Sequence, residues 1–192
     1  MKVRMKMKNI TVCFSGHRPE KLPGAGKCDN FKTKHIKKLL YEKILESIED
    51  EYTIFMSGMA RGIDLWAANI IISLKSKYEI KLICVKPTEN HGYNFPSEDK
   101  YDLNYILENA DEIVCTSDNY SKGCYNIRNK FMIDNSSRLI AFVNNFRSGT
   151  GQTINYAKKS NKDIVLIDLK EIDYVNTSNN YTTQNSFFQE EN

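Results

Sequence analysis

Six short apolar segments, separated by stretches with helical periodicity, constrain the fold of this chain most strongly. They span residues 10–14, 53–56, 80–85, 112–115, 139–143 and 164–167. The segments are almost continuously apolar instead of alternating with polar residues. That pattern is typical of parallel strands that are covered on both faces.

The stretches between these segments are long enough for helical crossovers. Residues 32–48 place apolar side chains at helical spacing, and residues 62–77 do the same. Weaker patterns predict helices at 98–109, 124–135 and 151–160. Strands joined by helices predict an α/β fold: a doubly wound, mainly parallel sheet of about six to seven strands with helices on both faces.

Composition divides the 192 residues into one domain and two short ends. Hydrophobic residues make up 41% and charged residues 27%, which is ordinary for a globular chain. We expect a basic N-terminal lead at 1–9, a nucleotide-binding domain at 10–170 and a polar tail at 171–192. Asn, Thr, Ser and Gln dominate the tail, which predicts a mobile segment.

Charge and cysteine usage limit the possible partners and compartments. The net charge is only +3, although residues 1–50 carry 12 Lys and Arg against 6 Asp and Glu. This balance argues against nucleic acid as the main partner. No apolar run approaches the ~20 residues of a membrane helix, and the basic start lacks a signal-peptide core. Five cysteines without CxxC spacing and three scattered histidines predict reduced thiols in a cytoplasm and no metal site.

The turn after the first segment is a candidate ligand-binding element. Ligands of open parallel sheets bind at the carboxyl ends of the strands. Small residues there let a ligand approach the backbone, and this turn also carries an imidazole and a guanidinium. The candidates are Ser15, Gly16, His17 and Arg18. The alternative is an ordinary polar turn.

The turn after the second segment has two glycines between a strand end and a helix start. Glycine lets backbone N–H groups face an anion at the positive end of a helix. Arg61 can add a bidentate contact to a phosphate. Asp64 falls in the first helical turn, where its carboxylate either caps the helix or interacts favourably with the helix dipole, or else contacts a ribose hydroxyl. The candidates are Ser57, Gly58, Met59, Ala60, Arg61, Gly62 and Asp64.

The turn after the fifth segment again offers amides, hydroxyls and glycines at a helix start. This combination suits a phosphate or pyrophosphate. The candidates are Ser148, Gly149, Thr150, Gly151 and Thr153. The alternative is a flexible turn that needs glycine only for its backbone geometry.

Residues 120–130 form a fourth candidate segment, at the start of a predicted helix. Tyr120 and Tyr125 can stack on a base, and Arg128 can reach a phosphate. A solvated basic helix face is the alternative. Counting Arg147 beside the fifth segment, four arginines are expected near one edge of the sheet: Arg18, Arg61, Arg128 and Arg147.

Four segments together resemble one protein family. They are SGHRPEKL (15–22), SGMARGIDLWAA (57–68), SDNYSKGCYNIRNKFMIDNS (117–136) and SGTGQTINYAKK (148–159). The chain resembles the YpsA-like branch of the SLOG superfamily, relatives of the DNA-processing protein DprA and the Lonely-guy (LOG) proteins, over about residues 10–168. The resemblance implies a Rossmann-like fold that binds nucleotides or derivatives such as NAD, ADP-ribose or cyclic nucleotides. It also implies homo-oligomers and a role in stress or phage-defence signalling.

Three function classes follow from the resemblance. The first is a sensor, carrier or sequestering protein for a nucleotide-derived ligand, with no further cofactor required. The second is a LOG-like hydrolase of an N-glycosidic or phosphate linkage. LOG enzymes carry a catalytic glutamate in a PGGxGTxxE motif, and the corresponding SGTGQTIN segment here has no glutamate, so a hydrolase would need its acid from Glu20 or Asp64. The third is DprA-like binding of single-stranded DNA, which the near-neutral charge disfavours.

Overall fold

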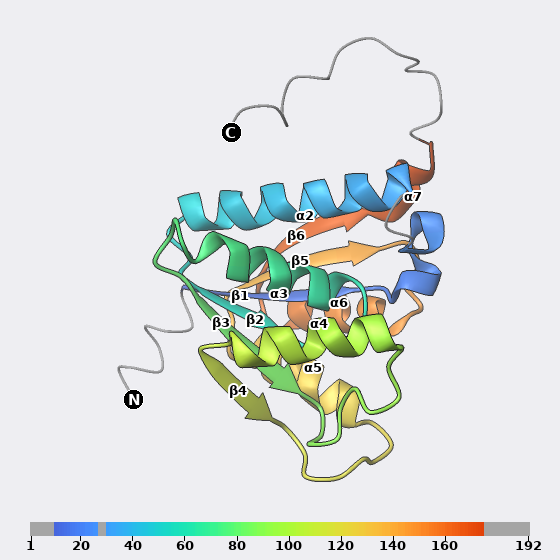
Figure 1. Ribbon diagram of the computed structural model, residues 1–192. Helices are drawn as coiled ribbons and strands as arrows, with labels where there is room; N and C mark the ends of the chain where they lie inside the picture. The colour runs from blue at the N-terminus through green and yellow to red at the C-terminus, as the bar shows by residue number, and fades with distance from the viewer. Residues whose placement is uncertain (1–9, 27–29, 175–192) are drawn as a thin grey trace.

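All six predicted strands form one parallel sheet (Figure 1). The computed structural model describes residues 10–26 and 30–174. The strands are β1 (Thr11–Gly16), β2 (Ile54–Ser57), β3 (Lys81–Lys86), β4 (Glu112–Cys115), β5 (Arg138–Val143) and β6 (Asp163–Asp168). Their order in the sheet is β4-β3-β2-β1-β5-β6, and every pairing is parallel. The predicted α/β fold class is confirmed.

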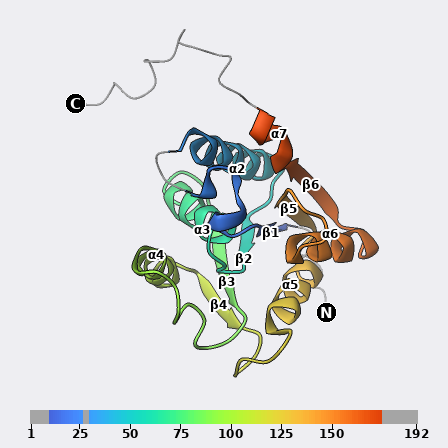
Figure 2. The ribbon, with the colours of Figure 1, turned by 90° about the vertical axis from the view of Figure 1, so that its right-hand side faces the viewer.

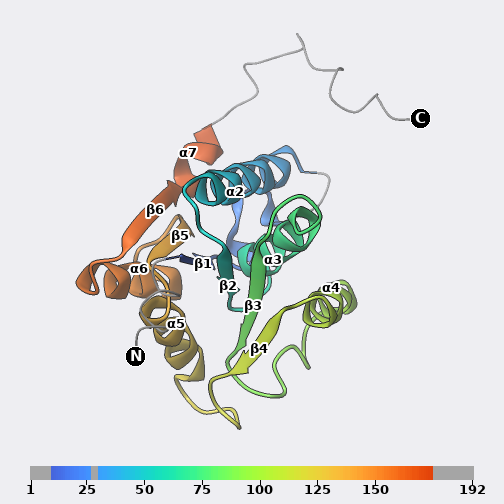
Figure 3. The same cartoon turned by 90° about the vertical axis from the view of Figure 1, so that its left-hand side faces the viewer.

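Helices cover both faces of the sheet, as Figures 2 and 3 show from opposite sides. The helices are α2 (Phe31–Glu49), α3 (Ile63–Leu74), α4 (Ser97–Glu108), α5 (Cys124–Asp134), α6 (Gly149–Lys159) and α7 (Leu169–Tyr174). Two short 3₁₀ segments, η1 (Pro19–Lys21) and η2 (Pro23–Gly26), follow β1. Helices α2, α3, α4 and α7 pack on one face, and α5 and α6 pack on the other.

Alternate side chains of each strand enter two separate cores. Val12 and Phe14 of β1 pack with α2 and α3, whereas Cys13 between them packs with α5 and α6. All three are buried. The period of two in a strand therefore requires apolar residues at every position, which explains the continuous runs in the sequence.

The domain extends beyond the boundary predicted at residue 170. Helix α7 runs to Tyr174, and Leu169 and Ile172 are buried against the core that contains α2. Their spacing of three places both on one face of a short helix. The predicted basic lead at 1–9 and the rest of the predicted tail, 175–192, lie outside the described residues.

The order of the strands creates a switch point between β1 and β5. Strands β1 to β4 lie side by side in chain order, and β5 then pairs with the other side of β1. Successive connections leave these two neighbouring strands toward opposite faces: α2 follows β1 and α6 follows β5. Ligands of open α/β sheets bind in the crevice that such a divergence opens at the carboxyl ends.

Candidate functional site

A pocket of about 330 Å³ lies at the carboxyl ends of β1 and β5, and we call it the switch-point pocket. All four predicted segments contribute to it. Its lining contains the predicted residues Ser15, Gly16, His17, Arg18, Ala60, Asp64, Tyr125, Arg128, Ser148, Gly149 and Thr150. Phe14, Lys21 and Asn129 also line it and were not predicted, and so does Glu20, which the sequence offers with Asp64 as the acid of a hydrolase.

A buried arginine of α5 faces this pocket. Arg128 is only 4% exposed, and its Nη1 lies 3.5 Å from Oδ2 of Asp64. Within the described part of the chain, neither Nε nor Nη1 of Arg128 has a hydrogen-bond partner. Burial lowers the pKa of Arg128 and raises that of Asp64, while each charge opposes the shift of the other. Arg128 therefore lines the pocket with a buried guanidinium that is ion-paired with Asp64 and whose Nε and Nη1 have no hydrogen-bond partner among the described residues.

Gly58 makes room for that arginine. A Cβ at Gly58 would lie 2.0 Å from Nη1 of Arg128 and 2.8 Å from Oδ2 of Asp64. This glycine therefore serves the packing of the Asp64–Arg128 pair, which is a different reason from the anion cradle that the sequence suggests.

The start of α6 presents backbone donors to the same pocket. Oγ of Ser148 caps the helix by accepting from the N–H of Gly151 at 3.2 Å. The N–H groups of Gly149 and Thr150 occupy the first two helical positions, which have no intrahelical acceptor. A Cβ built at Gly149 would meet nothing within 4 Å. These donors and the helix dipole favour an anion at this position.

The other small residues of the α6 turn have structural partners. A Cβ at Gly151 would lie 2.0 Å from the carbonyl oxygen of Phe146, so close backbone packing requires this glycine. Oγ1 of Thr153 donates to the carbonyl of Gly149 at 3.0 Å and accepts from Nδ2 of Asn129 at 2.9 Å. Gly151 and Thr153 therefore support the pocket wall and are not among its lining residues.

His17 joins the ends of the two central strands. It is buried, and its Nε2 accepts a hydrogen bond from the N–H of Asn144 at 3.2 Å. An accepting Nε2 carries no proton, so the ring is neutral, and burial lowers its pKa accordingly. The side chain of Asn144 in turn donates to the carbonyl of Lys21 at 2.9 Å.

The turn at 57–64 is filled by the protein's own groups. Oδ2 of Asp64 accepts from the N–H of Ala60 at 3.3 Å, and Oγ of Ser57 donates to the carbonyl of Asp64 at 2.7 Å. Gly62 has φ +87°, and a Cβ there would lie 2.6 Å from the carbonyl oxygen of His17. The carboxylate of Asp64 therefore lies in the first turn of α3, where the helix dipole favours it, and it holds the preceding loop through Ala60; no side chain caps this helix among the described residues.

Arg61 lies outside the pocket lining. Its Nε donates to Oδ2 of Asp99 on α4 at 2.5 Å, and its Nη1 pairs with Oε1 of Glu20. Arg147 is exposed and does not line the pocket either. Of the four arginines expected at this edge, the structure brings Arg18 and Arg128 to the pocket.

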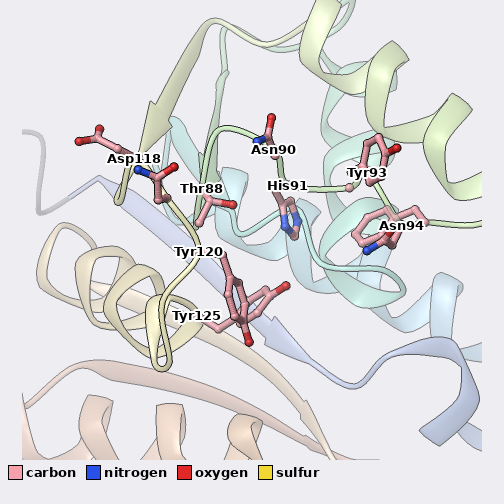
Figure 4. A pocket seen from close by; sticks show the side chains of 11 residues that line it. Thr88, Asn90, His91, Tyr93, Asn94, Asp118, Tyr120 and Tyr125 are labelled. Atoms are coloured by element: carbon pink, nitrogen blue, oxygen red, sulfur yellow. The ribbon is translucent and has the colours of Figure 1, made fainter.

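A second pocket of about 490 Å³ adjoins the first, and we call it the aromatic pocket (Figure 4). The loop between β3 and α4 forms one wall, and the loop before α5 forms the other. Its lining comprises Thr88, Asn90, His91, Gly92, Tyr93, Asn94, Phe95, Asp118, Asn119, Tyr120 and Tyr125. The sequence analysis missed the β3–α4 loop, although its aromatic and amide side chains follow a strand end.

Two structural features are absent from residues 10–26 and 30–174. No helix in these ranges is both long and apolar enough to cross a membrane. No cluster of three or more His, Cys, Asp or Glu side chains in the same ranges is arranged to hold a metal ion.

Comparison with known proteins connects the chain to one family and one fold. The sequence model of YpsA, described as the YspA SLOG family, matches residues 12–176. The UPF0398 protein of Macrococcus caseolyticus is 29% identical over 153 residues, which cover 74% of this chain and 82% of that protein.

Two solved structures of DNA processing protein A share the fold. The protein from Helicobacter pylori, described with a single-stranded DNA binding mode, aligns with a TM-score of 0.57 at 16% identity. That alignment covers 89% of this chain and 74% of the other. The Streptococcus pneumoniae protein aligns with a TM-score of 0.58 at 21% identity, covering 83% and 50%.

Proposed function

Since the chain belongs to the YpsA family of the SLOG superfamily, we propose that it binds a nucleotide-derived small molecule in the switch-point pocket and acts as a sensor, carrier or sequestering protein. NAD, ADP-ribose and cyclic nucleotides are the ligands of first interest. The observation that carries this proposal is the buried guanidinium of Arg128, which lines the pocket and whose Nε and Nη1 have no hydrogen-bond partner among the described residues.

The surroundings of Arg128 support a phosphate as the group that it binds. Gly149 and Thr150, whose N–H groups occupy the first two positions of α6, line the same pocket as this guanidinium. Arg18 and Lys21 add positive charge at its mouth, although Glu20 and Asp64 are also present. Backbone amides at a helix start together with arginine are a common way to hold phosphate.

Calorimetric titration with AMP, NAD, ADP-ribose and a cyclic nucleotide tests the proposal. Saturation at about 100 times the dissociation constant stabilises the fold by about 2.7 kcal/mol, which a thermal-shift assay detects independently. The double variant Asp64→Asn/Arg128→Gln removes the guanidinium without leaving Asp64 charged and unpaired. We expect it to lose binding while remaining folded.

A matched control is Arg138→Gln, the same change at the opposite end of β5. Arg138 pairs with Asp50 and Asp163, far along the strand from the pocket. It should weaken the fold without changing ligand affinity. If no compound binds the unmodified protein, or if the double variant binds as well as the parent, the proposal is wrong.

Turnover is the enzymatic alternative. A LOG-like hydrolase needs a carboxylate acid, and the α6 turn supplies none. Asp64 lines the pocket but is held by Arg128 and by the N–H of Ala60. Chromatography of the incubated compounds decides between the classes: unchanged ligands support binding, and new products lost in Asp64→Asn support hydrolysis.

Single-stranded DNA is a second candidate because of the likeness to DNA processing protein A. The protein from Helicobacter pylori is described by its single-stranded DNA binding mode. At 16% identity, this likeness shows a shared fold, and DNA binding by this chain is a question for direct measurement. A fluorescently labelled oligonucleotide measures DNA binding directly. An affinity that rises as the salt concentration falls, together with resistance to competition by free nucleotides, would favour DNA.

A further inference from the structure

The aromatic pocket lies beside the phosphate-binding candidates and shares one residue with them. Tyr125 lines both pockets. Its ring centroid lies 5.9 Å from Cζ of Arg128 on one side and 6.1 Å from the His91 ring on the other. Tyr125 therefore borders both pockets, which places the aromatic pocket directly beside the guanidinium of Arg128.

Packing holds the β3–α4 wall of this pocket in place. The Phe95 ring meets the His91 ring edge-on at 5.2 Å. Gly92, at φ +91°, lies so close to Leu103 of α4 that a Cβ there would approach Cδ2 to 2.2 Å. His91 also donates from Nε2 to the carbonyl of Met59 at 2.8 Å, which ties this wall to the turn at 57–64.

The opposite wall carries the tyrosines. Figure 4 shows Tyr120 and Tyr125 entering from the α5 side, across from His91 and Tyr93. Tyr120 is 77% exposed and Tyr125 is 37% exposed, so both rings have faces available for stacking. Exposed aromatic rings of this kind can stack on any of the nucleobases, because every base has a flat π face.

Polar groups around the rings supply hydrogen bonds for the edge of a base. Because Nε2 of His91 donates to Met59, its Nδ1 is an acceptor. No described residue forms a hydrogen bond with the side-chain amides of Asn90, Asn94 and Asn119. An asparagine amide pairs with adenine through one donor and one acceptor.

We propose that the aromatic pocket is the base subsite of the same ligand, so that the ligand is an adenine nucleoside phosphate with its phosphate at Arg128 and its base at Tyr120 and Tyr125. This inference rests on the proposed function, and it narrows the ligand class from phosphate-bearing compounds to those with a base in the second pocket. A base attached to phosphate also occurs in a DNA strand, so the experiment separates these two sources.

Calorimetry with AMP, ribose 5-phosphate, adenosine and a short oligodeoxyadenylate tests the inference. We expect AMP to bind at least tenfold more tightly than ribose 5-phosphate, because stacking on an aromatic side chain contributes that much or more. Tyr120→Ala should lower AMP affinity about tenfold and leave ribose 5-phosphate affinity unchanged. The control is Tyr101→Ala, since Tyr101 on α4 is 75% exposed and lines neither pocket.

Each alternative outcome has a distinct meaning. Equal affinity for AMP and ribose 5-phosphate overturns the base subsite but retains the proposed phosphate site. Adenosine binding as tightly as AMP shows that the phosphate contributes nothing, which overturns the proposed function and the two-part site with it. Absence of binding by all four probes overturns the adenine nucleoside phosphate as the ligand, while the titrations with NAD, ADP-ribose and a cyclic nucleotide decide the proposed function. If the oligodeoxyadenylate binds more tightly than AMP and AMP cannot displace it, the pockets bind a DNA strand. The proposal of a free nucleotide as the ligand is then wrong.

Discussion

Two strand-to-helix turns look alike in the sequence and differ in the structure. Both the turn at 57–64 and the turn at 148–151 place two glycines beside a helix start. In the first, the space above Gly58 is filled by Arg128, and Asp64 in the first turn of α3 accepts from the N–H of Ala60 in the preceding loop. In the second, the space above Gly149 is empty, and the first N–H groups of α6 line a pocket.

The difference shows that a glycine at a helix start has two unrelated uses. It permits either close packing of the protein's own groups or close approach of a ligand. The first turn builds the pocket by holding Arg128 and Asp64 in place, and the second leaves room for what binds there. Substitutions in the first turn should therefore affect stability, and substitutions in the second should affect binding.

Among the substitutions that test this comparison, Asp64→Asn should have the largest effect on stability. It leaves the Arg128 charge buried without its partner, which should lower the free energy of unfolding by about 3 kcal/mol. Urea unfolding measures the loss. Adding Arg128→Gln should recover part of the stability because no unpaired charge remains. If Asp64→Asn alone were as stable as the parent protein, the first turn would not depend on this ion pair.

Gly62→Ala should have the next largest effect. The backbone of Gly62 has φ +87° and ψ −125°, and the new Cβ would lie 2.6 Å from the carbonyl oxygen of His17. Strain and overpacking together should cost about 2–3 kcal/mol in urea unfolding. Because the contact is with backbone, a side-chain rotation cannot relieve it. A loss of stability no larger than the experimental error would mean that the first turn tolerates an added Cβ as well as the second turn does.

Acid should weaken the contacts of the first turn through His91. Burial lowers the pKa of His91 from 6.5 to about 4 in the folded state. Between these values the unfolded chain binds more protons than the folded chain, so the free energy of unfolding falls as the pH drops from about 6.5 to about 4. The expected loss is about 1–2 kcal/mol after allowing for partial exposure.

His91→Gln provides the control for this pH dependence. Glutamine retains a side-chain N–H that can donate to the carbonyl of Met59 but does not titrate. Unfolding measured by urea across this pH window should therefore have a smaller slope in the variant. His17, whose pKa burial also lowers, acts in the same direction and should leave a residual slope. An unchanged slope would exclude His91 as its source.

The sequence predicted the sheet more fully than the site. Apolar runs located all six strands because both faces are buried, and β4 was predicted with its observed ends at 112–115. The start of α6 was predicted at 151, two residues late, since the cap by Ser148 brings Gly149 and Thr150 into the helix. Local patterns thus determine elements, while caps determine their ends.

The site depends on contacts between distant parts of the chain, which no local pattern reports. Arg128 meets Asp64 across 64 positions of sequence, and Arg61 was predicted to face a phosphate but pairs with Glu20 and Asp99. The sequence identifies these charges without their partners. The β3–α4 wall of the aromatic pocket was missed for the same reason: His91 acquires its place by donating to Met59, on another turn.

The smallest effect on stability, and the sharpest test of the comparison, is expected from Gly149→Ala. Its Cβ would project into open space, so the free energy of unfolding should stay within about 0.5 kcal/mol of the parent. The same Cβ would lie beside the N–H groups proposed to hold phosphate, so AMP affinity should fall about tenfold, or 1.4 kcal/mol. Urea unfolding and calorimetry on one preparation measure both quantities. Unchanged affinity would mean that the empty space above this glycine is not where the phosphate binds, and that the contrast between the two turns concerns packing alone.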